Sequence, residues 1–244
     1  MIKRLENFVD SEEYYPARNS YRGIVVLALV SKALTVARAV CCLVDNGFPG
    51  EAFGLSRTLI DICFTVRYIS NADTEARAKL FAEFYAKDHE GWGKIIHKFY
   101  PSTVVKETEA HREALAKAKN YKNAHQWTGM GDQTRQMACE PDAYEFDPAG
   151  NGINCEWDYE VIYKWTSFYI HSTVSALEGH FMEPREPFRI RGRHSIDKNR
   201  EEDTLVNVLG YISRIFVHAY RAMKHDAPEE ILQDVHKTIA AFTT

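Results

Sequence analysis

The sequence predicts an all-α helical bundle, and two observations carry this prediction. Apolar side chains recur at helical spacing through several long segments, and no segment shows the alternation of apolar and polar residues that is typical of a strand. The first segment, residues 21–46, contains no proline over a length that corresponds to about 39 Å of helix. A helix of that length can form the spine of a bundle.

The limits of the first three helices follow from turn residues. Gly47 is expected to end the first helix, because glycine readily takes the left-handed conformation found at helix ends. Pro49 opens the second helix, which ends near residue 70. Thr74 is expected to cap the third helix, and Pro101 marks its end.

Further helices are expected along the rest of the chain, and irregular stretches separate them. The helices are expected over residues 103–122, 157–181, 199–224 and 227–241, with a short helical candidate at 131–139. Gly, Pro, Asn and Asp accumulate in 123–156, and 183–198 holds prolines and arginines. We expect a single domain over residues 1–244, with an N-terminal arm at 1–19 and the two irregular stretches as insertions.

The charge balance excludes one broad class of protein. The 244 residues include 30 Lys and Arg against 34 Asp and Glu, which gives a formal net charge of −4. A globally basic nucleic-acid-binding protein is therefore excluded, whereas a local basic patch is compatible with this balance.

Cysteine usage and the apolar segments indicate a reduced cytoplasmic protein with no membrane partner. The five cysteines form no C-x-x-C pair, and three of them lie in apolar helical runs, where a free thiol behaves as a small hydrophobe. The most apolar segment, Gly23 to Val44, contains Lys32 and Arg38. Each charge would cost about 2.5–3.5 kcal/mol near the centre of a bilayer, so a buried helix is the expected structure.

Polar residues on an apolar helix are the first candidates for a site. Arg57 and Asp61 lie four residues apart on the second helix, so they share one face. Apolar residues occur nearly all round this helix, and burying each charge there carries a desolvation penalty. Two interpretations stay open: a structural ion pair between helices, and a functional pair.

A second polar stripe follows the aromatic helix at 157–181. Tyr163, Ser167 and His171 follow one another at i, i+4 and i+8, and Ser167 and His171 are spaced for a shared hydrogen bond. A serine hydrolase is not expected, because the sequence has no G-x-S-x-G turn. A single histidine on a helix is more often a core residue, and its alignment with Ser167 and Tyr163 is what makes it a candidate.

Arginines elsewhere suggest an anionic ligand. Arg38 lies on a polar stripe of the first helix and is expected to point into the same interior as Arg57, an arrangement that suits a phosphate. The loop at 183–198 carries a basic patch that is either a solvated loop or a phosphate-backbone contact, made of Arg185, Arg189, Arg191 and Arg193 beside His194.

No cofactor and no metal is expected. The sequence contains no Glu-x-x-His pair of the di-iron bundles, no P-loop and no G-x-G-x-x-G. Trp127-Thr128-Gly129, in the long irregular stretch, has the composition of an anchored turn in which the tryptophan packs and the glycine bends.

Together these motifs resemble a bacterial family, the domain-of-unknown-function family 5677. The resemblance covers residues 25–180 and rests on Arg38, the turn at Gly47, and E-A-x-x-L-x-R-x-L-x-D from Glu51 to Asp61. Trp127-Thr128-Gly129 resembles the W-S-G-like motif of the family, and Tyr163, Ser167 and His171 match its Y-x-x-x-S-x-x-x-H motif.

The layout is also similar to that of the HEPN superfamily of helical bundles. That similarity implies a metal-independent ribonuclease or a toxin of antiphage and toxin–antitoxin systems, with a site assembled in a homodimer. Its R-x(4–6)-H motif has two candidate counterparts: His171 with Arg57 supplied in space, or Arg189 with His194.

Three functions are open at this point. In a ribonuclease, His171 would act as general acid or base, Arg57 and Arg38 would stabilise phosphoryl charge, Asp61 would hold Arg57, and Ser167 would orient the imidazole. In a non-catalytic module, the same cluster with Tyr163 and Trp127 would bind a small anionic ligand or fix helix register. In an interaction protein, the apolar helices would pack against a partner such as an antitoxin.

Overall fold

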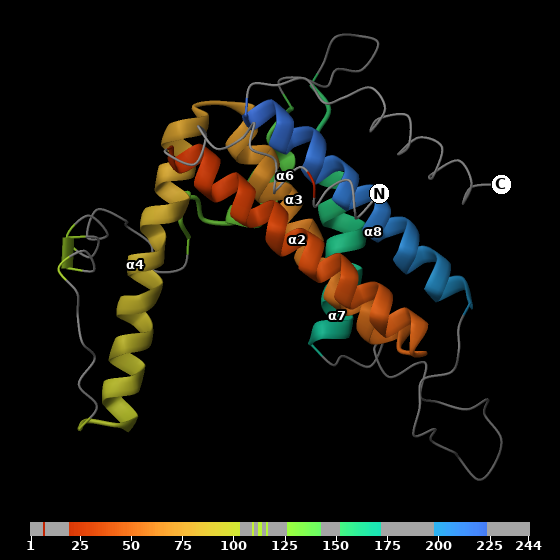
Figure 1. Cartoon of the computed structure of the whole chain (residues 1–244), viewed down its shortest axis with the longest axis horizontal. Helices are drawn as coiled ribbons and strands as arrows, with labels where there is room; N and C mark the ends of the chain where they lie inside the picture. The colour runs from red at the N-terminus through yellow and green to blue at the C-terminus, as the bar shows by residue number, and fades with distance from the viewer. Residues whose placement is uncertain are drawn as a thin grey trace.

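The structure is a computed structural model that describes residues 20–102, 126–142, 152–171 and 198–223, with a few single positions between 7 and 116. All regular elements in these residues are helices, which confirms the predicted all-α fold (Figure 1). They are α2 (Tyr21–Asp45), α3 (Pro49–Asn71), α4 (Thr74–Phe99), α6 (Gln133–Cys139), the π-helical segment η2 (Asp158–Tyr163), α7 (Lys164–Ile170) and α8 (Lys198–Ala222). Of the helix expected at 103–122 the structure describes only single positions, which are helical, and the helix expected at 227–241 lies outside the described residues.

The turn between α2 and α3 forms as the sequence predicts. Gly47 has a φ of 79°, in the left-handed region that favours glycine, and its N–H donates to the carbonyl of Val44 at 2.9 Å. Pro49 is the first residue of α3, where its missing N–H leaves no helical hydrogen bond unmade. The two helices therefore lie side by side as an antiparallel pair (Figure 1).

The start of α4 differs from the prediction in one detail. Thr74 is the first helical residue and not the cap; the preceding Asp73 takes a left-handed φ of 42° and makes no side-chain cap hydrogen bond. The carboxylate of Glu75 accepts the backbone N–H groups of Tyr21 and Arg22 at 2.9 and 3.1 Å. A negative charge at the N-terminus of α2 is electrostatically favourable, so this contact fixes α4 to α2.

The aromatic helix expected over 157–181 is not uniform. It opens with the six-residue π-helical segment η2, continues as α7 and ends at Ile170, with His171 as the C-cap residue. A π-helical turn is rare and is frequently found at functional sites. The continuation expected at 172–181 lies outside the part of the chain that the structure describes.

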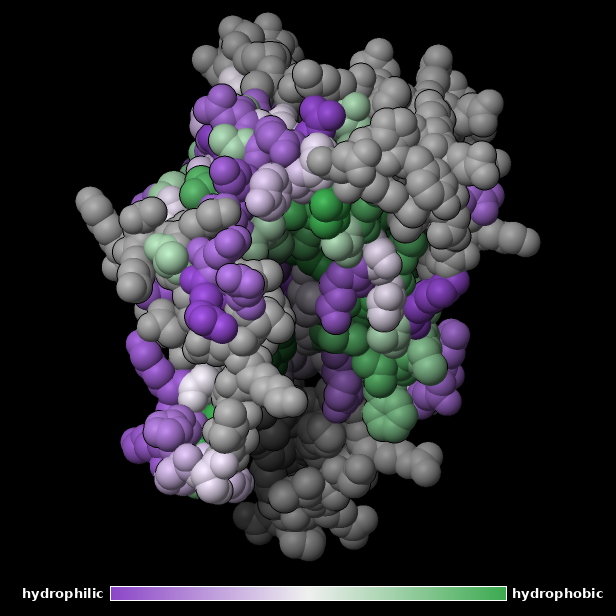
Figure 2. All heavy atoms as spheres, turned by 60° about the vertical axis from the view of Figure 1, so that its left-hand side comes forward, coloured by the Kyte–Doolittle hydropathy of each residue, from purple (hydrophilic) through white to green (hydrophobic). Residues whose placement is uncertain are grey.

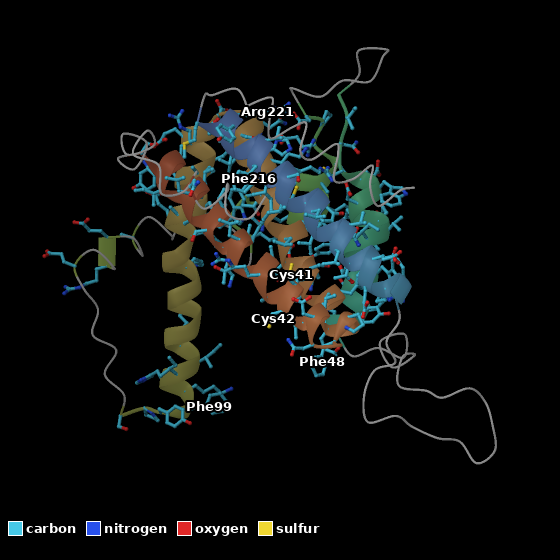
Figure 3. All side chains as sticks on the ribbon, turned by 45° about the vertical axis from the view of Figure 1, so that its right-hand side comes forward. Cys41, Cys42, Phe48, Phe99, Phe216 and Arg221 are labelled. Carbon is cyan, nitrogen blue, oxygen red and sulfur yellow. The ribbon has the colours of Figure 1, made fainter. Side chains whose placement is uncertain are left out.

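Helix α3 lies at the centre of the bundle. It packs against α2, α8 and α7 along its length and contacts α4 and α6 (Figure 1). Its Phe53, Leu59 and Phe64 are fully buried, as are Ile215 and Phe216 of α8, and Phe216 lies in the middle of the bundle in Figure 3. Burying a side chain of this size stabilises the fold by about 1.5–3 kcal/mol.

Helix α2 is long and apolar enough to cross a membrane, judged by length and composition alone. Its apolar side chains, Val26, Val30 and Val40 among them, are nevertheless buried in the bundle, where α3, α4 and α8 cover them. Figure 2 looks from the side of α4 and shows hydrophobic residues gathered in a hollow near the centre of this face, with hydrophilic residues around it.

Candidate functional site

Arg57 and Asp61 lie half-buried on α3, one turn apart, as predicted. They do not form the direct ion pair that their spacing suggests, because the guanidinium of Arg57 is engaged by an aromatic side chain of the neighbouring helix. Its Nη2 donates to the hydroxyl oxygen of Tyr163 at 2.5 Å, and its central carbon lies 4.5 Å from the centre of that ring. Tyr163 thus joins the two predicted polar stripes.

Neighbouring rings hold Tyr163 in place. Its ring stacks on Tyr159, with the ring centres 5.2 Å apart, and lies 6.2 Å from the ring of Phe64 on α3. A guanidinium over an aromatic face is attracted by the ring quadrupole, and this attraction strengthens when water is excluded. Contacts with Tyr163 of η2 therefore fix the orientation of the Arg57 side chain.

The guanidinium of Arg57 keeps hydrogen-bonding capacity that the described residues do not use. Its Nε is buried and has no hydrogen-bond partner. Its only hydrogen bond is the one from Nη2 to Tyr163, so Nη1 also makes none within the described ranges. A buried donor without a partner carries a desolvation penalty of about 1–3 kcal/mol, which a bound acceptor would relieve.

The carboxyl group of Asp61 changes its protonation near neutral pH. Burial raises the pKa of Asp61 to about 6, while the charge of Arg57 and hydrogen bonding with Tyr163 act in the opposite direction. At this pKa the group can accept a proton, or donate one, under physiological conditions. Arg57, Asp61 and Tyr163 together are called the Arg57 centre below.

Ser167 and His171 extend the stripe along α7, but they do not form the predicted hydrogen bond. The Ser167 hydroxyl donates to the backbone carbonyl of Tyr163 at 2.6 Å, the usual local partner for a serine inside a helix. The N–H of His171 donates to the Ser167 carbonyl at 3.0 Å, and the imidazole is exposed at the helix end. No contact joins His171 to Arg57 within the described residues.

Arg38 does not share the interior with Arg57, so that expectation is wrong. It lies on the solvent-exposed stripe of α2, where its helical neighbours Ser31, Thr35 and Cys42 are exposed as well. The opposite faces of α2 carry the valines and leucines that pack on the bundle, which leaves the polar stripe facing outward. Arg189, Arg191 and Arg193 lie outside the described residues.

Trp127 is a packing residue. Its ring is buried and lies edge-on to Tyr68 of α3 and Phe81 of α4, at 5.6 and 5.2 Å between centres. Gly129 follows with a φ of 74° and turns the chain away. The predicted anchored turn is thereby confirmed, and Trp127 fastens the segment before α6 to the bundle and does not face the Arg57 centre.

A buried ionic cluster was missed by sequence reasoning. Arg67 of α3 and Asp142, which follows α6, are each 1% exposed, and Arg67 Nε lies 3.5 Å from the Asp142 carboxylate. His218 and Arg221 of α8 reach the same carboxylate oxygen at 3.6 and 3.8 Å. Arg67 also donates to the carbonyls of Met137, Glu140 and Ile153. The sequence does contain a signal for this cluster, because Arg67 is a charged residue within the apolar run I-C-F-T-V-R-Y-I-S of α3.

The cluster also contains a serine, a histidine and an aspartate placed in space like a hydrolase triad: Ser70, His218 and Asp142. Their burial excludes that role. All three are at most 2% exposed, and the Ser70 hydroxyl donates to the carbonyl of Arg67 at 2.9 Å. Burial and the charges of Arg221, Arg67 and Arg214 hold the pKa of His218 well below its usual range, so the imidazole is neutral. The cluster joins α3, α6 and α8.

Two further sets of partly buried interactions tie α8 to the aromatic helix. Arg214 donates to the carboxylate of Asp158 at 3.0 Å, and the Tyr211 hydroxyl donates to the same group at 2.8 Å. Near the start of α8, the guanidinium of Arg200 lies 4.7–5.2 Å from the ring centres of Phe53, Trp165 and Tyr169. Cation–π contacts of this kind fix α8 against α3 and α7.

No group of three or more His, Cys, Asp or Glu residues suitable for a metal ion occurs among the described residues. All five cysteines are free thiols. Burial raises the pKa of Cys63 to about 12, so this thiol is unreactive at neutral pH.

Fold and site together define an all-α protein that carries a half-buried arginine, carboxyl and phenol between two helices. The chain belongs to the family of unknown function DUF5677, which matches residues 23–188. The match includes α2 to α7, and hence every residue of the Arg57 centre, but ends before α8. Comparison with curated proteins and with solved structures gave no match.

Proposed function

We propose that the protein is a helical binding module whose Arg57 centre takes a small oxyanion such as a phosphate or a carboxylate group. One observation carries this proposal: a half-buried guanidinium, oriented by Tyr163, retains two nitrogens without a hydrogen-bond partner in the described residues. Guanidinium groups bind phosphate and carboxylate through paired N–H donors, and partial burial strengthens the interaction.

The protonation state of the Asp61 carboxyl should determine how tightly the Arg57 centre binds an anion. When protonated it is a hydrogen-bond donor beside the anion, and when ionised it repels the anion. Because the pKa of Asp61 is about 6, we expect a bound anion to be held more tightly at pH 5.5 than at pH 7.5. Asp61→Asn retains a neutral donor at every pH and should remove this dependence.

Titration with sulfate, whose charge is constant over this pH range, tests the proposal. Thermal unfolding of the wild-type protein should shift upward with sulfate, more at pH 5.5 than at pH 7.5. Arg57→Gln should abolish the shift, whereas Arg135→Gln, which removes an exposed arginine of α6, should retain it. An equal shift in all three proteins would place the anion elsewhere and refute the proposal.

A second candidate is a HEPN-like, metal-independent endoribonuclease of a defence or toxin–antitoxin system. The observation that favours it is the exposed imidazole of His171, one turn beyond Ser167 on the helix that carries Tyr163. His171 would exchange the proton of a ribose 2′-hydroxyl, and Arg57 would stabilise the phosphoryl charge. Since Arg57 and His171 do not touch within one chain, this function relies on a homodimer in which a second copy supplies one of them.

Incubation of the wild-type protein and His171→Ala with total RNA in EDTA separates the two candidates. Cleavage by the wild type alone would establish a ribonuclease and identify RNA as the phosphate-bearing ligand. Intact RNA with both proteins, combined with a sulfate shift that depends on Arg57, would leave the binding module as the function.

A further inference from the structure

At the end of α4 and its C-cap residue, residues 94–100, apolar and basic side chains lie on opposite sides of the helix. Successive residues of an α-helix are about 100° apart, which places four apolar residues on one arc and three basic residues on the opposite arc. The apolar residues are Ile95, Ile96, Phe99 and Tyr100, and the basic residues are Lys94, His97 and Lys98. This segment is called the α4 tip.

The α4 tip stands clear of the bundle. The first half of α4 packs against α2 and α3, and Phe84 is its last buried side chain among those described. Beyond it the helix projects from the body of the molecule (Figure 1), and Phe99 lies at its far end, away from the other labelled residues (Figure 3). All seven side chains of the tip are exposed, and Phe99 is 67% exposed.

The charge and composition of the α4 tip indicate which kind of surface it binds. An apolar face opposite a face with lysines is typical of helices that lie in the interface of an anionic membrane, with the apolar face towards the acyl chains and the lysines among the headgroups. A tyrosine at the boundary suits the same environment, because its ring is amphipathic. The ammonium of Lys98 lies 5.7 Å from the centre of the Phe99 ring, so charge and apolar surface are adjacent.

We propose that the α4 tip binds the surface of an anionic lipid bilayer. A second copy of the chain is a poorer occupant, because a stable dimer buries about 800 Å² per partner and the tip offers only four apolar side chains at the end of one helix. For interfacial binding, by contrast, a few apolar side chains and two lysines are enough to contribute measurably.

This inference differs from the expectation that the protein has no membrane partner. That expectation rested on Lys32 and Arg38, which oppose a helix that spans the bilayer. A helix end that lies in the headgroup layer leaves α2 in the bundle and requires no charge to enter the acyl core. The proposal is also independent of the Arg57 centre, because neither uses a residue of the other.

Cosedimentation of the full-length protein with vesicles tests the proposal. The wild-type protein should bind vesicles of equal parts phosphatidylglycerol and phosphatidylcholine and should not bind phosphatidylcholine alone. Phe99→Glu should weaken this binding by about tenfold, because it places a charge in the apolar arc. Trp157→Glu, at a position 65% exposed on another helix, is the matched control and should bind as the wild type does.

The lysines are tested separately, which keeps the result independent of any effect of Phe99→Glu on folding. Lys94→Gln with Lys98→Gln should reduce binding and its sensitivity to salt, whereas Lys32→Gln with Arg38→Gln, on the exposed stripe of α2, should change neither. Absence of binding to the anionic vesicles, or equal losses of binding in the tip and control variants, would overturn the proposal. So would a molar mass of Phe99→Glu in solution that differs from that of the wild type, because it would identify the tip as an interface between copies of the chain.

Discussion

The hydroxyl of Tyr163 and the guanidinium of Arg57 meet at 2.5 Å although 106 residues separate them in the chain. This contact joins the two polar stripes of the sequence into one centre and replaces the ion pair expected between Arg57 and Asp61. Burial raises the pKa of the Asp61 carboxyl to about 6, although the charge of Arg57 and hydrogen bonding with Tyr163 act in the opposite direction.

The ionisation of Asp61 should make folding less favourable as the pH rises. The folded-state pKa of about 6 lies above the ordinary value of 3.8, so between these two pH values the folded protein binds more protons than the unfolded chain does. The stabilisation is complete below pH 3.8 and is lost as the pH rises through 6. We expect Asp61→Asn to be more stable than the wild type by about 2–3 kcal/mol at pH 7.5 and equally stable near pH 4.

Urea unfolding of both proteins at several pH values measures this difference. Titration of His218 affects both proteins alike, so it cancels when they are compared. A constant difference across the range would mean that Asp61 ionises normally in the folded protein.

Removal of the buried carboxylate should destabilise the fold severely. Asp142→Ala leaves Arg67, which is 1% exposed, and Arg221 without their shared counter-charge, and we expect a loss of about 3–5 kcal/mol. The exposed pair of Lys164 and Glu160 provides the comparison, since Lys164→Ala should cost at most about 0.5 kcal/mol. Similar losses in the two variants, measured by urea unfolding, would contradict the assigned burial.

Two helical glycines should respond in opposite ways to alanine. A Cβ atom at Gly210 of α8 meets nothing within 4 Å, so Gly210→Ala should stabilise the protein by about 0.5–1 kcal/mol. A Cβ atom at Gly54 of α3 would lie 3.2 Å from the Cβ of Tyr169, at the close approach of α3 and α7. Gly54→Ala should therefore leave the free energy of unfolding unchanged or lower it. Differential scanning calorimetry gives both values, and equal stabilisation would indicate that α3 and α7 are further apart.

The exposed imidazole of His171 should contribute little to stability. His171→Ala removes an exposed side chain that makes no hydrogen bond or ion pair with the described residues, and its backbone cap is retained. We expect the melting temperature to change by no more than about 2 °C. A larger loss would show that His171 packs against residues outside the described ranges, and would make any loss of function in this variant a folding effect.

The helices were predictable because their signals are local. The end of α2 at Gly47 and the start of α3 at Pro49 follow from backbone preferences of single residues. The stripe of Tyr163, Ser167 and His171 was predictable from spacing alone. The π-helical turn of η2 was not, since it depends on how the helix packs and carries no sequence signal of this kind.

The buried cluster at Asp142 was not predictable, because it depends on tertiary contacts. Its members come from α3, the residues after α6, and α8, and a charged residue in a single helix does not reveal its partners. The outward position of Arg38 shows the same limit. Which face of an apolar helix is covered depends on the number of neighbours it has, and α2 has neighbours on all but one side.

The distance in sequence between α3 and α8 has a consequence in time. Helix α3 leaves the ribosome before α8, and 126 residues (72–197) must be synthesised between the end of α3 and the start of α8. At about 5–20 residues per second this takes about 6–25 s, during which the side of α3 that packs against α8 is uncovered. A nascent chain with that much apolar surface is a natural client for chaperones, and slow codons before residue 198 should raise the fraction that aggregates.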